Sequence, residues 1–126
     1  MTTNSVESLF AQSLAHSALS QKQQAVLRGC LYLFAEQGYD RTTTADIAKK
    51  AGVSEGTVYK HFKNKREILD ALLEPLQTGV FPAVAAEFTQ SVSAQQFTDL
   101  ESALRYLVRD RLQFILANRL VIRLFL

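Results

Sequence analysis

The stretch TTADIAKKAGVSEGTVYKHF, from Thr43 to Phe62, decides the fold of this chain. Apolar residues recur at helical spacing on both sides of Gly52, which predicts one helix over Thr44–Ala51 and a second over Glu55–Phe62. Between them, the run Gly52-Val53-Ser54 breaks the helical pattern. The stretch therefore predicts two short helices joined by a tight turn, which is a helix-turn-helix.

Both helices have suitable capping residues at their starts. Thr43 and Asp46 have the spacing of a capping box in its aspartate form. Ser54 precedes the second helix, and a serine hydroxyl accepts a hydrogen bond from a free amide of the first helical turn. The caps predict where each helix begins.

Three positions indicate how the two helices pack. With Thr44 as the first position of a helix-turn-helix, Ala48 is fifth, Gly52 ninth and Val58 fifteenth. The fifth position faces the second helix at the closest crossing and must be small. The ninth turns the chain sharply and favours glycine, which adopts the left-handed conformation without steric cost. The fifteenth packs the second helix on the first, and the rest of the motif core is predicted to be Ile47, Ala51, Val53 and Phe62.

Cationic side chains are concentrated around this motif. The segment from Arg41 to Arg66 holds seven lysines and arginines against two acids, a balance of +5 in a chain whose net charge is +2. A compact basic segment within a mildly acidic remainder is an electrostatic footprint for phosphate. A solvated helix face has a similar composition, so charge alone leaves both interpretations open.

The flanking sequence predicts further helices throughout, and the fold class is all-α. Ser20 is suited to cap a helix over Gln21–Gln37, with Gly38 as a left-handed terminator and Gly29 where a neighbouring helix comes close. Later helices are predicted from Lys65 towards Gly79, from Pro82 onward, and after a capping box formed by Thr98 and Glu101. Residues 1–19, with Val6, Leu9, Phe10 and Leu14 at helical spacing, predict a docked or frayed helix.

At these residues the chain resembles the DNA-binding domain of the tetracycline-repressor (TetR) family. The resemblance covers about Gln24 to Leu73 and rests on LFAEQGY (33–39), Thr42-Thr43, DIA (46–48), AGVS (51–54), GTVY (56–59), His61-Phe62, Lys65 and Leu69. It implies a three-helix, homeodomain-like domain over residues 20–73, preceded by an extension over residues 1–19. Residues 74–126 are then the first helices of an all-helical effector-binding and dimerisation domain.

The resemblance also implies a function. Family members are homodimers that bind a palindromic operator in double-stranded DNA, and a small-molecule effector releases them; most are repressors. The effector and its binding residues cannot be read from this sequence. A bacterial, cytoplasmic protein that joins the nucleoid when bound to its operator is expected.

Site residues follow from the resemblance and from helix chemistry. Phosphate contacts are expected from Thr43, Tyr59, His61 and Lys65, and from Ser54 at the start of the second helix. Gly56 lets that helix approach the bases, while Thr57 and Lys60 are the expected base readers. Glu55 either stabilises the helix N-terminus or accepts a hydrogen bond from cytosine N4.

Several other classes of protein have little support in the sequence. No apolar run approaches the roughly 20 residues of a membrane-spanning helix, and no cationic start of a signal peptide is present. Cys30, His16 and His61 lack metal-ligand spacing, so no metal or cofactor is expected, and Cys30 is predicted to be a small core residue. No catalytic signature is found, which argues against an enzyme.

Two alternatives to a repressor stay open at this point. A helix-turn-helix that docks only to protein would not need the basic segment, and an all-α enzyme would need a constellation of titratable groups in the second half. Core positions, rather than a cage around an effector, are expected for the aromatic residues Tyr32, Phe81, Phe88, Phe97, Tyr106 and Phe114, although some of them could serve both purposes. The apolar run Val121–Leu126 is expected to be left bare, as in a fragment of a longer protein.

Overall fold

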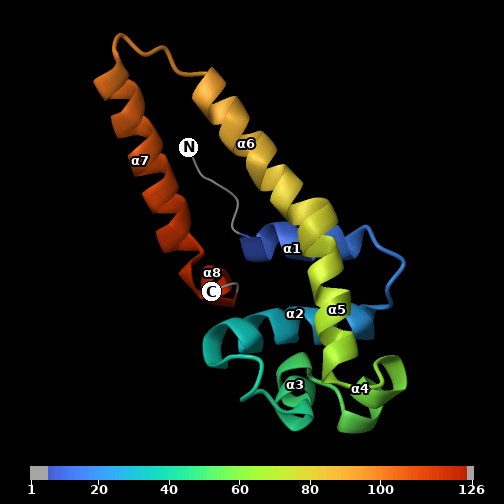
Figure 1. The fold of residues 1–126 in the computed structure, drawn as a ribbon. Coiled ribbons are helices and arrows are strands. Elements are labelled where there is room, and N and C mark those ends of the chain that lie inside the picture. Colours follow the sequence, from blue (N-terminus) through green and yellow to red (C-terminus); the bar gives the residue numbers. More distant parts are fainter. Residues whose placement is uncertain (1–5, 125–126) are drawn as a thin grey trace.

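The all-α class is confirmed: the regular structure in residues 6–124, the part that the computed structural model describes, is helical (Figure 1). The elements are α1 (Val6–Ala15), α2 (Gln21–Gln37), α3 (Thr44–Ala51), α4 (Glu55–His61), α5 (Lys65–Pro75), the π-helical turn η1 (Leu76–Val80), α6 (Phe81–Ser93), α7 (Leu100–Ala117) and α8 (Arg119–Leu124). Helices α3 and α4 lie together at one end of the molecule, below α2 (Figure 1).

The core of the helix-turn-helix end forms between α2, α3, α4 and α5. Its fully buried side chains include Leu27, Phe34, Ile47, Val58 and Ile68, each at most 1% exposed. Helices α2 and α3 cross closely, as Gly29 predicted: a Cβ atom built there would lie 3.3 Å from Lys50 Cγ.

The end of α2 differs from the prediction. Gly38 has a positive φ of 89° but a ψ of 156°, so it is not in the left-handed helical region. Its N–H still donates to the Phe34 carbonyl (3.0 Å), which ends the helix. The extended ψ turns the Gly38 carbonyl towards the buried Thr42 hydroxyl, which donates to it at 2.7 Å. A local hydrogen bond thus selects a different glycine conformation.

The single helix predicted from Lys65 to Gly79 is interrupted. Helix α5 ends at Pro75, and the next turn is π-helical before α6 begins at Phe81. Proline has no N–H to donate to the carbonyl four residues earlier, so the regular ladder is broken there. The Phe81 amide then bonds the Leu76 carbonyl across the wider turn.

The start of α7 also differs. Its cap is Asp99, whose carboxylate accepts from the Ser102 amide at 2.8 Å, and not the box predicted from Thr98 and Glu101. Glu101 is engaged elsewhere, because its carboxylate accepts from Arg105 at 2.6 Å. The hydrogen bonds between the Asp99 carboxylate and Ser102 lower the pKa of Asp99.

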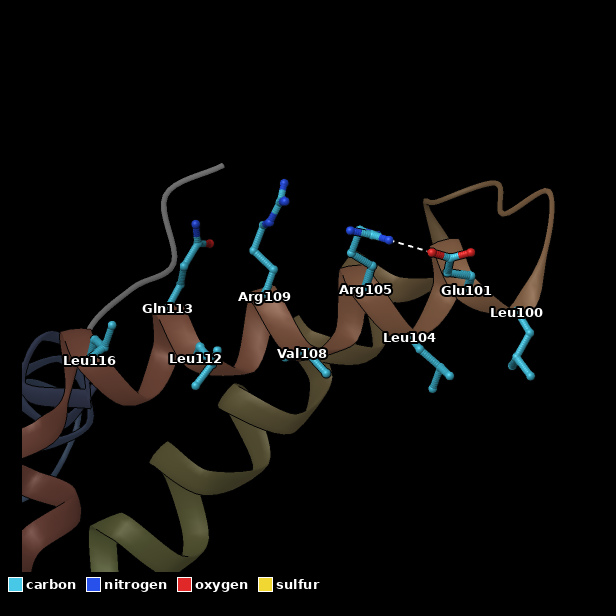
Figure 2. Close-up of a pocket in the computed structure, with 9 residues that line it drawn as sticks. All are labelled: Leu100, Glu101, Leu104, Arg105, Val108, Arg109, Leu112, Gln113 and Leu116. Atoms are coloured by element: carbon cyan, nitrogen blue, oxygen red, sulfur yellow. Dashed lines mark hydrogen bonds and ion pairs between the residues drawn. The ribbon is translucent and has the colours of Figure 1, made fainter.

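Helix α7 has no buried residue, and a shallow, open hollow of about 760 Å³ lies along it. Leu100, Leu104, Val108 and Leu112 project to one side of the helix, while the polar side chains Glu101, Arg105, Arg109 and Gln113 project to the other (Figure 2). Leu116 adds a fifth apolar side chain near the end of the helix. The five apolar side chains are each more than half exposed.

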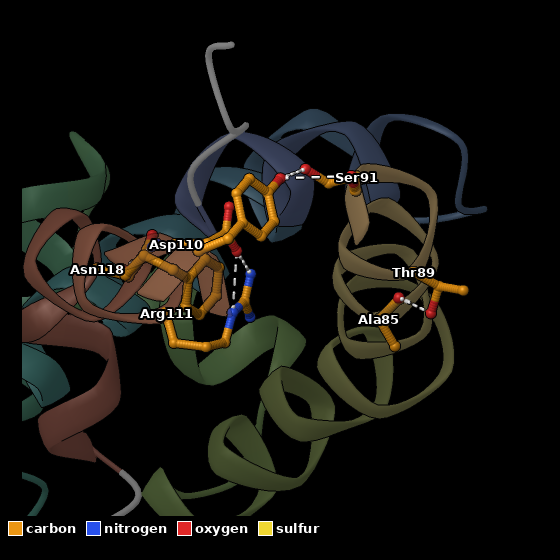
Figure 3. Close-up of polar contacts among 8 residues, drawn as sticks. Ala85, Thr89, Ser91, Asp110, Arg111 and Asn118 are labelled. Carbon is orange, nitrogen blue, oxygen red and sulfur yellow. Dashed lines mark hydrogen bonds and ion pairs between the residues drawn. The ribbon is translucent and has the colours of Figure 1, made fainter. Parts of the chain in front are cut away.

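Polar contacts join α7 to α6. The Ser91 and Tyr106 hydroxyls lie 2.6 Å apart, and the Arg111 guanidinium lies 3.8 Å from the centre of the Phe88 ring. Arg111 also pairs with Asp110 at 2.6 Å (Figure 3). The aromatic core prediction is wrong in part, since Tyr32, Phe81 and Phe97 are 37, 40 and 36% exposed. Tyr32 carries the Lys50 ammonium over its ring, and such a cation needs water on one side.

Both ends of the described chain pack against the rest. Val121 in α8 is 3% exposed and α8 lies against α2, so the prediction that this apolar run is bare is wrong for Val121; residues 125–126 lie outside the described part. Helix α1 buries Val6, Phe10 and Leu14 against α2, α5 and η1. The N-terminal helix is therefore docked.

Candidate nucleic-acid interface

The turn between α3 and α4 has the geometry that the register requires. Gly52 has φ 74° and ψ 30°, in the left-handed helical region, where a side chain is strained. Its N–H bonds the Lys49 carbonyl at 3.3 Å, and the Val53 amide bonds the Ala48 carbonyl at 3.0 Å. Ala48 (4% exposed) and Val58 (1%) then lie buried. A small residue, a glycine and a compact aliphatic residue together hold α4 across α3.

The start of α3 is closed by a complete capping box. The Thr43 hydroxyl accepts from the Asp46 amide, and the Asp46 carboxylate accepts from the Thr43 amide, each at 3.1 Å. The Gln37 side-chain amide adds a further donor to Asp46 at 3.3 Å. These hydrogen bonds lower the pKa of the Asp46 carboxyl, and those with Thr43 have the largest effect. Thr43 remains exposed at the end of the helix.

Helix α4 presents one face to the core and the other to solvent. The Ser54 hydroxyl caps it by accepting from the Thr57 amide at 3.1 Å and lies 2.9 Å from the Thr57 hydroxyl. Its buried anchors are Val58 and, just past its end, Phe62 (5% exposed). The outward residues are Glu55, Gly56, Tyr59 and Lys60, all exposed, with Thr57 and His61 half-buried. The predicted contact residues of this helix are thus all exposed or half-buried.

Tyr59 links the two helices on the outer surface. Its hydroxyl donates to Thr44 Oγ1 at 3.2 Å, while the residue is 54% exposed. The hydroxyl retains acceptor capacity, since a phenol both donates and accepts. Tyr59 therefore connects α4 to the first turn of α3, next to Thr43, the residue that caps the start of α3.

Lys65 is placed differently from the other predicted phosphate contacts. Its ammonium donates to the carbonyls of Tyr39 (2.7 Å) and Thr42 (3.1 Å) and lies 4.2 Å from the centre of the Tyr39 ring. These contacts join the start of α5 to the loop that leads to Thr43. Two of the three ammonium hydrogens are thereby committed to the protein.

Most of the basic segment lies at the surface: six of its seven cations are exposed, and Lys65 is half-buried. Lys50 lies over the Tyr32 ring at 4.0 Å, and Arg66 pairs with Asp70 at 3.3 Å while staying exposed. Lys60 and Lys63 are exposed beside the end of α4.

The structure adds Lys22 to the candidate interface, a residue that sequence reasoning missed. A cleft of about 420 Å³ separates the start of α2 from α4, and it is lined by Ser20, Gln21, Lys22, Thr57, Lys60 and His61. Lys22 lies 38 positions before Lys60 in the sequence, and no local pattern connects the two. Only the packing of α4 against α2 brings these cations to one cleft.

Other kinds of site find little support among residues 6–124. No group of three or more potential metal ligands is present there, and no helix in this range is long and apolar enough to cross a membrane. Cys30 is fully buried, and burial raises the pKa of its thiol to about 12. The thiol is held as a core group.

Comparison with known proteins identifies the same segment. Residues 26–72 match the family described as "Bacterial regulatory proteins, tetR family". The chain is 54% identical over 43 residues to the HTH-type transcriptional regulator TtgR of Pseudomonas putida, covering 34% of this chain and 20% of that protein. It is 42% identical over 57 residues to the class C tetracycline repressor protein of Escherichia coli, covering 45% and 26%.

A third relative matches a longer part of the chain. The nucleoid occlusion factor SlmA of Pasteurella multocida is 34% identical over 82 residues, covering 64% of this chain and 39% of that protein. The matched parts thus span between a fifth and two fifths of the length of these three relatives.

Proposed function

We propose that this chain, whose residues 26–72 match the tetR family of bacterial regulatory proteins, is a transcriptional repressor that binds a palindromic operator as a homodimer in the bacterial cytoplasm. The observation that carries the proposal is the exposed face of α4. The left-handed turn at Gly52 positions this face, and Lys60 and Lys63 lie exposed at the end of the helix.

The contacts proposed for α4 follow from its exposed side chains. Gly56 leaves room for the helix to enter the major groove, where Thr57 and Lys60 read base edges; lysine donates to guanine O6 and N7, and the threonine methyl meets a thymine methyl. Glu55, exposed in the first turn, is proposed to stabilise the helix N-terminus or to accept from cytosine N4.

The phosphate contacts are proposed from residues around α4. The phosphate backbone of the DNA on either side of the major groove is bound by Thr43, Ser54, Tyr59 and His61. These contacts position the helix without specifying sequence. Lys65, whose ammonium bonds two loop carbonyls, is proposed to support Thr43 from inside the domain.

The regulatory part of the proposal concerns residues 74–126. One helix-turn-helix reads only a few base pairs, so tight specific binding requires two half-sites about 34–36 Å apart, held by two-fold symmetry. We assign dimerisation and release by a small-molecule effector to the second half of the protein. The exposed apolar row on α7 lies in this half and is surface that a second copy of the chain would cover.

Selection of duplexes from a random DNA pool tests the proposal. Recovery of a palindrome with half-sites about one helical turn apart is expected. Affinity for the selected site should fall steeply with salt, with a slope of about −0.9 for each phosphate neutralised. Enrichment of no sequence, or binding that does not respond to salt, would refute the proposal.

A matched pair of variants separates base reading from charge. Lys60→Ala should relax sequence preference at one position of each half-site, at a cost of about 1–3 kcal/mol. Lys63→Ala removes an equally exposed cation three residues later and should weaken all sequences alike. Equal behaviour of the two variants would contradict the assignment of Lys60 as a base reader.

A further inference from the structure

The N-terminal helix α1 is tied to a distant part of the chain by a buried hydrogen bond. The amide of Val6, the first residue of α1, donates to Asn118 Oδ1 at 2.8 Å across 112 positions of sequence. Val6 and Asn118 are only 3 and 4% exposed. First-turn amides have no partner within their own helix, so a buried one depends on an outside acceptor. Asn118 supplies that acceptor.

Asn118 is itself the joint between α7 and α8. Its side-chain amide donates to the Phe114 carbonyl in α7 at 3.0 Å, and its carbonyl accepts from the Ile122 amide in α8 at 3.0 Å. Helix α8 lies against α2, the first helix of the helix-turn-helix end. A displacement of Asn118 therefore acts on α7, α8 and α1 together.

Further along, α1 crosses the break between α5 and α6. A Cβ atom built on Gly79, in the π-helical turn, would lie 2.8 Å from Ser13 Oγ and 3.5 Å from Ser13 Cβ. No side chain fits between the two backbones there. Isolated π-helical turns are frequent at functional sites and mark places where a helix is not regular. Figure 1 shows α1 running from the α7–α8 end of the molecule to this turn.

We propose that α1 is a strap that couples the α7–α8 joint at Asn118 to the π-helical turn through which α5 leaves the helix-turn-helix end. Movement at the joint passes along α1, whose Phe10 and Leu14 are 0 and 1% exposed, and shifts α5 and α2. The strap lies outside residues 26–72, the segment that matches the family. Its effect on DNA rests on the proposed function, whereas the coupling itself does not.

A reversible lock on the strap tests the coupling. Ser13→Cys combined with Gly79→Cys places two Cβ atoms about 3.5 Å apart, within the range of a disulfide. Cys30 is fully buried and will not compete for the bond. Amide hydrogen exchange in α8 is then compared between the oxidised and reduced forms of the same protein. Oxidation is expected to slow exchange in α8 by at least threefold, although the lock lies at the other end of α1.

Asn118 variants show whether the response passes through the joint. In the locked protein, Asn118→Ala should abolish the response of α8, and Asn118→Asp, which keeps an acceptor for the Val6 amide, should retain it. An α8 that exchanges identically in both redox forms, or one that still responds with alanine at 118, overturns the proposal. If Asn118→Ala does not fold, the redox comparison with Asn118 in place still decides.

A DNA measurement extends the test to function. Affinity for a labelled 30-base-pair duplex pool of random sequence is expected to change at least threefold on oxidation, and not in the Asn118→Ala background. If the affinity for DNA is the same in the oxidised and reduced forms while hydrogen exchange in α8 differs between them, α1 has a structural role only, and its proposed role in DNA binding is overturned. A chain that binds no duplex in any form would refute the proposed function, while the exchange measurements would still decide the coupling.

Discussion

Replacing Lys65 with methionine separates two roles for this residue, phosphate contact and internal support. Methionine keeps an unbranched side chain of similar length and removes the charge and all three donors. In the structure the Lys65 ammonium bonds the Tyr39 and Thr42 carbonyls and lies over the Tyr39 ring. The Tyr39 carbonyl keeps a second donor, the Thr42 amide at 3.2 Å. The Thr42 carbonyl, in a residue only 1% exposed, loses its ammonium donor.

The expected magnitude follows from these contacts. A hydrogen bond to a charged group contributes about 1.5–3 kcal/mol, and a partly exposed cation–π contact about 0.5–1 kcal/mol. Because Lys65 is half-buried and one carbonyl keeps a partner, we take the lower part of this range and expect a loss of about 2 kcal/mol. For a chain of this size that lowers the melting temperature by roughly 8 °C.

Salt titration of DNA binding tells the two roles apart. A phosphate contact adds about 0.9 to the slope of log affinity against log salt, whereas an internal support adds nothing. We expect Lys65→Met to lose stability and affinity while the slope stays unchanged. The matched control Lys63→Met removes an exposed cation and should leave stability within about 0.5 kcal/mol. A Lys65→Met protein of wild-type stability, with its slope reduced by about one, would refute the internal role.

Three further predictions concern the motif and the core. Gly52→Val should cost about 2 kcal/mol or more in unfolding free energy, because a β-branched residue is strained at φ 74°. Gly52→Asn should cost about half as much. Equal denaturant midpoints for the two variants and the wild type would show that the turn is not strained. The hydrogen bonds with Thr43 hold the pKa of Asp46 below 3.8, so the stability that the ionised carboxylate contributes is complete above about pH 4 and is lost as the pH falls through the lowered pKa. The unfolding free energy of Asp46→Asn, measured as the pH is lowered, should therefore change less than that of the wild type. Parallel curves would contradict this. Cys30, with a pKa near 12, should resist a thiol reagent at pH 8 until the protein is unfolded, and rapid labelling of native protein would disprove its burial.

The parts of the fold that were predicted from sequence are those that local chemistry determines. The capping box of Thr43 and Asp46, the left-handed Gly52 and the close crossing at Gly29 each follow from one residue type in a short window. The failures near helix ends have local causes as well. Pro75 replaced a regular helix by a π-turn, and Glu101 was already paired with Arg105, which left Asp99 to cap α7.

The parts that were not predicted depend on contacts between distant segments. Lys22 reaches the interface only because α4 packs beside the start of α2. A pattern of residue spacing carries no signal for such a meeting, since periodicity reports which face of a helix is apolar and not which helix will cover it. For the same reason the exposure of Tyr32, which lies under Lys50, was missed.

Three long-range polar contacts bear directly on how the DNA-reading helices are held. The Lys65 ammonium reaches back 26 and 23 positions to the loop before α3, and the Val6 amide reaches forward 112 positions to the α7–α8 joint. Hydrogen bonds of this kind are directional and satisfy groups that are costly to leave unpaired, so they fix a geometry that apolar packing alone would leave adjustable. The face of α4 is therefore built by local rules, whereas the loop before α3 and the α7–α8 joint are each held by polar groups from distant segments. Variation at those groups should alter regulation while leaving the helix-turn-helix itself intact.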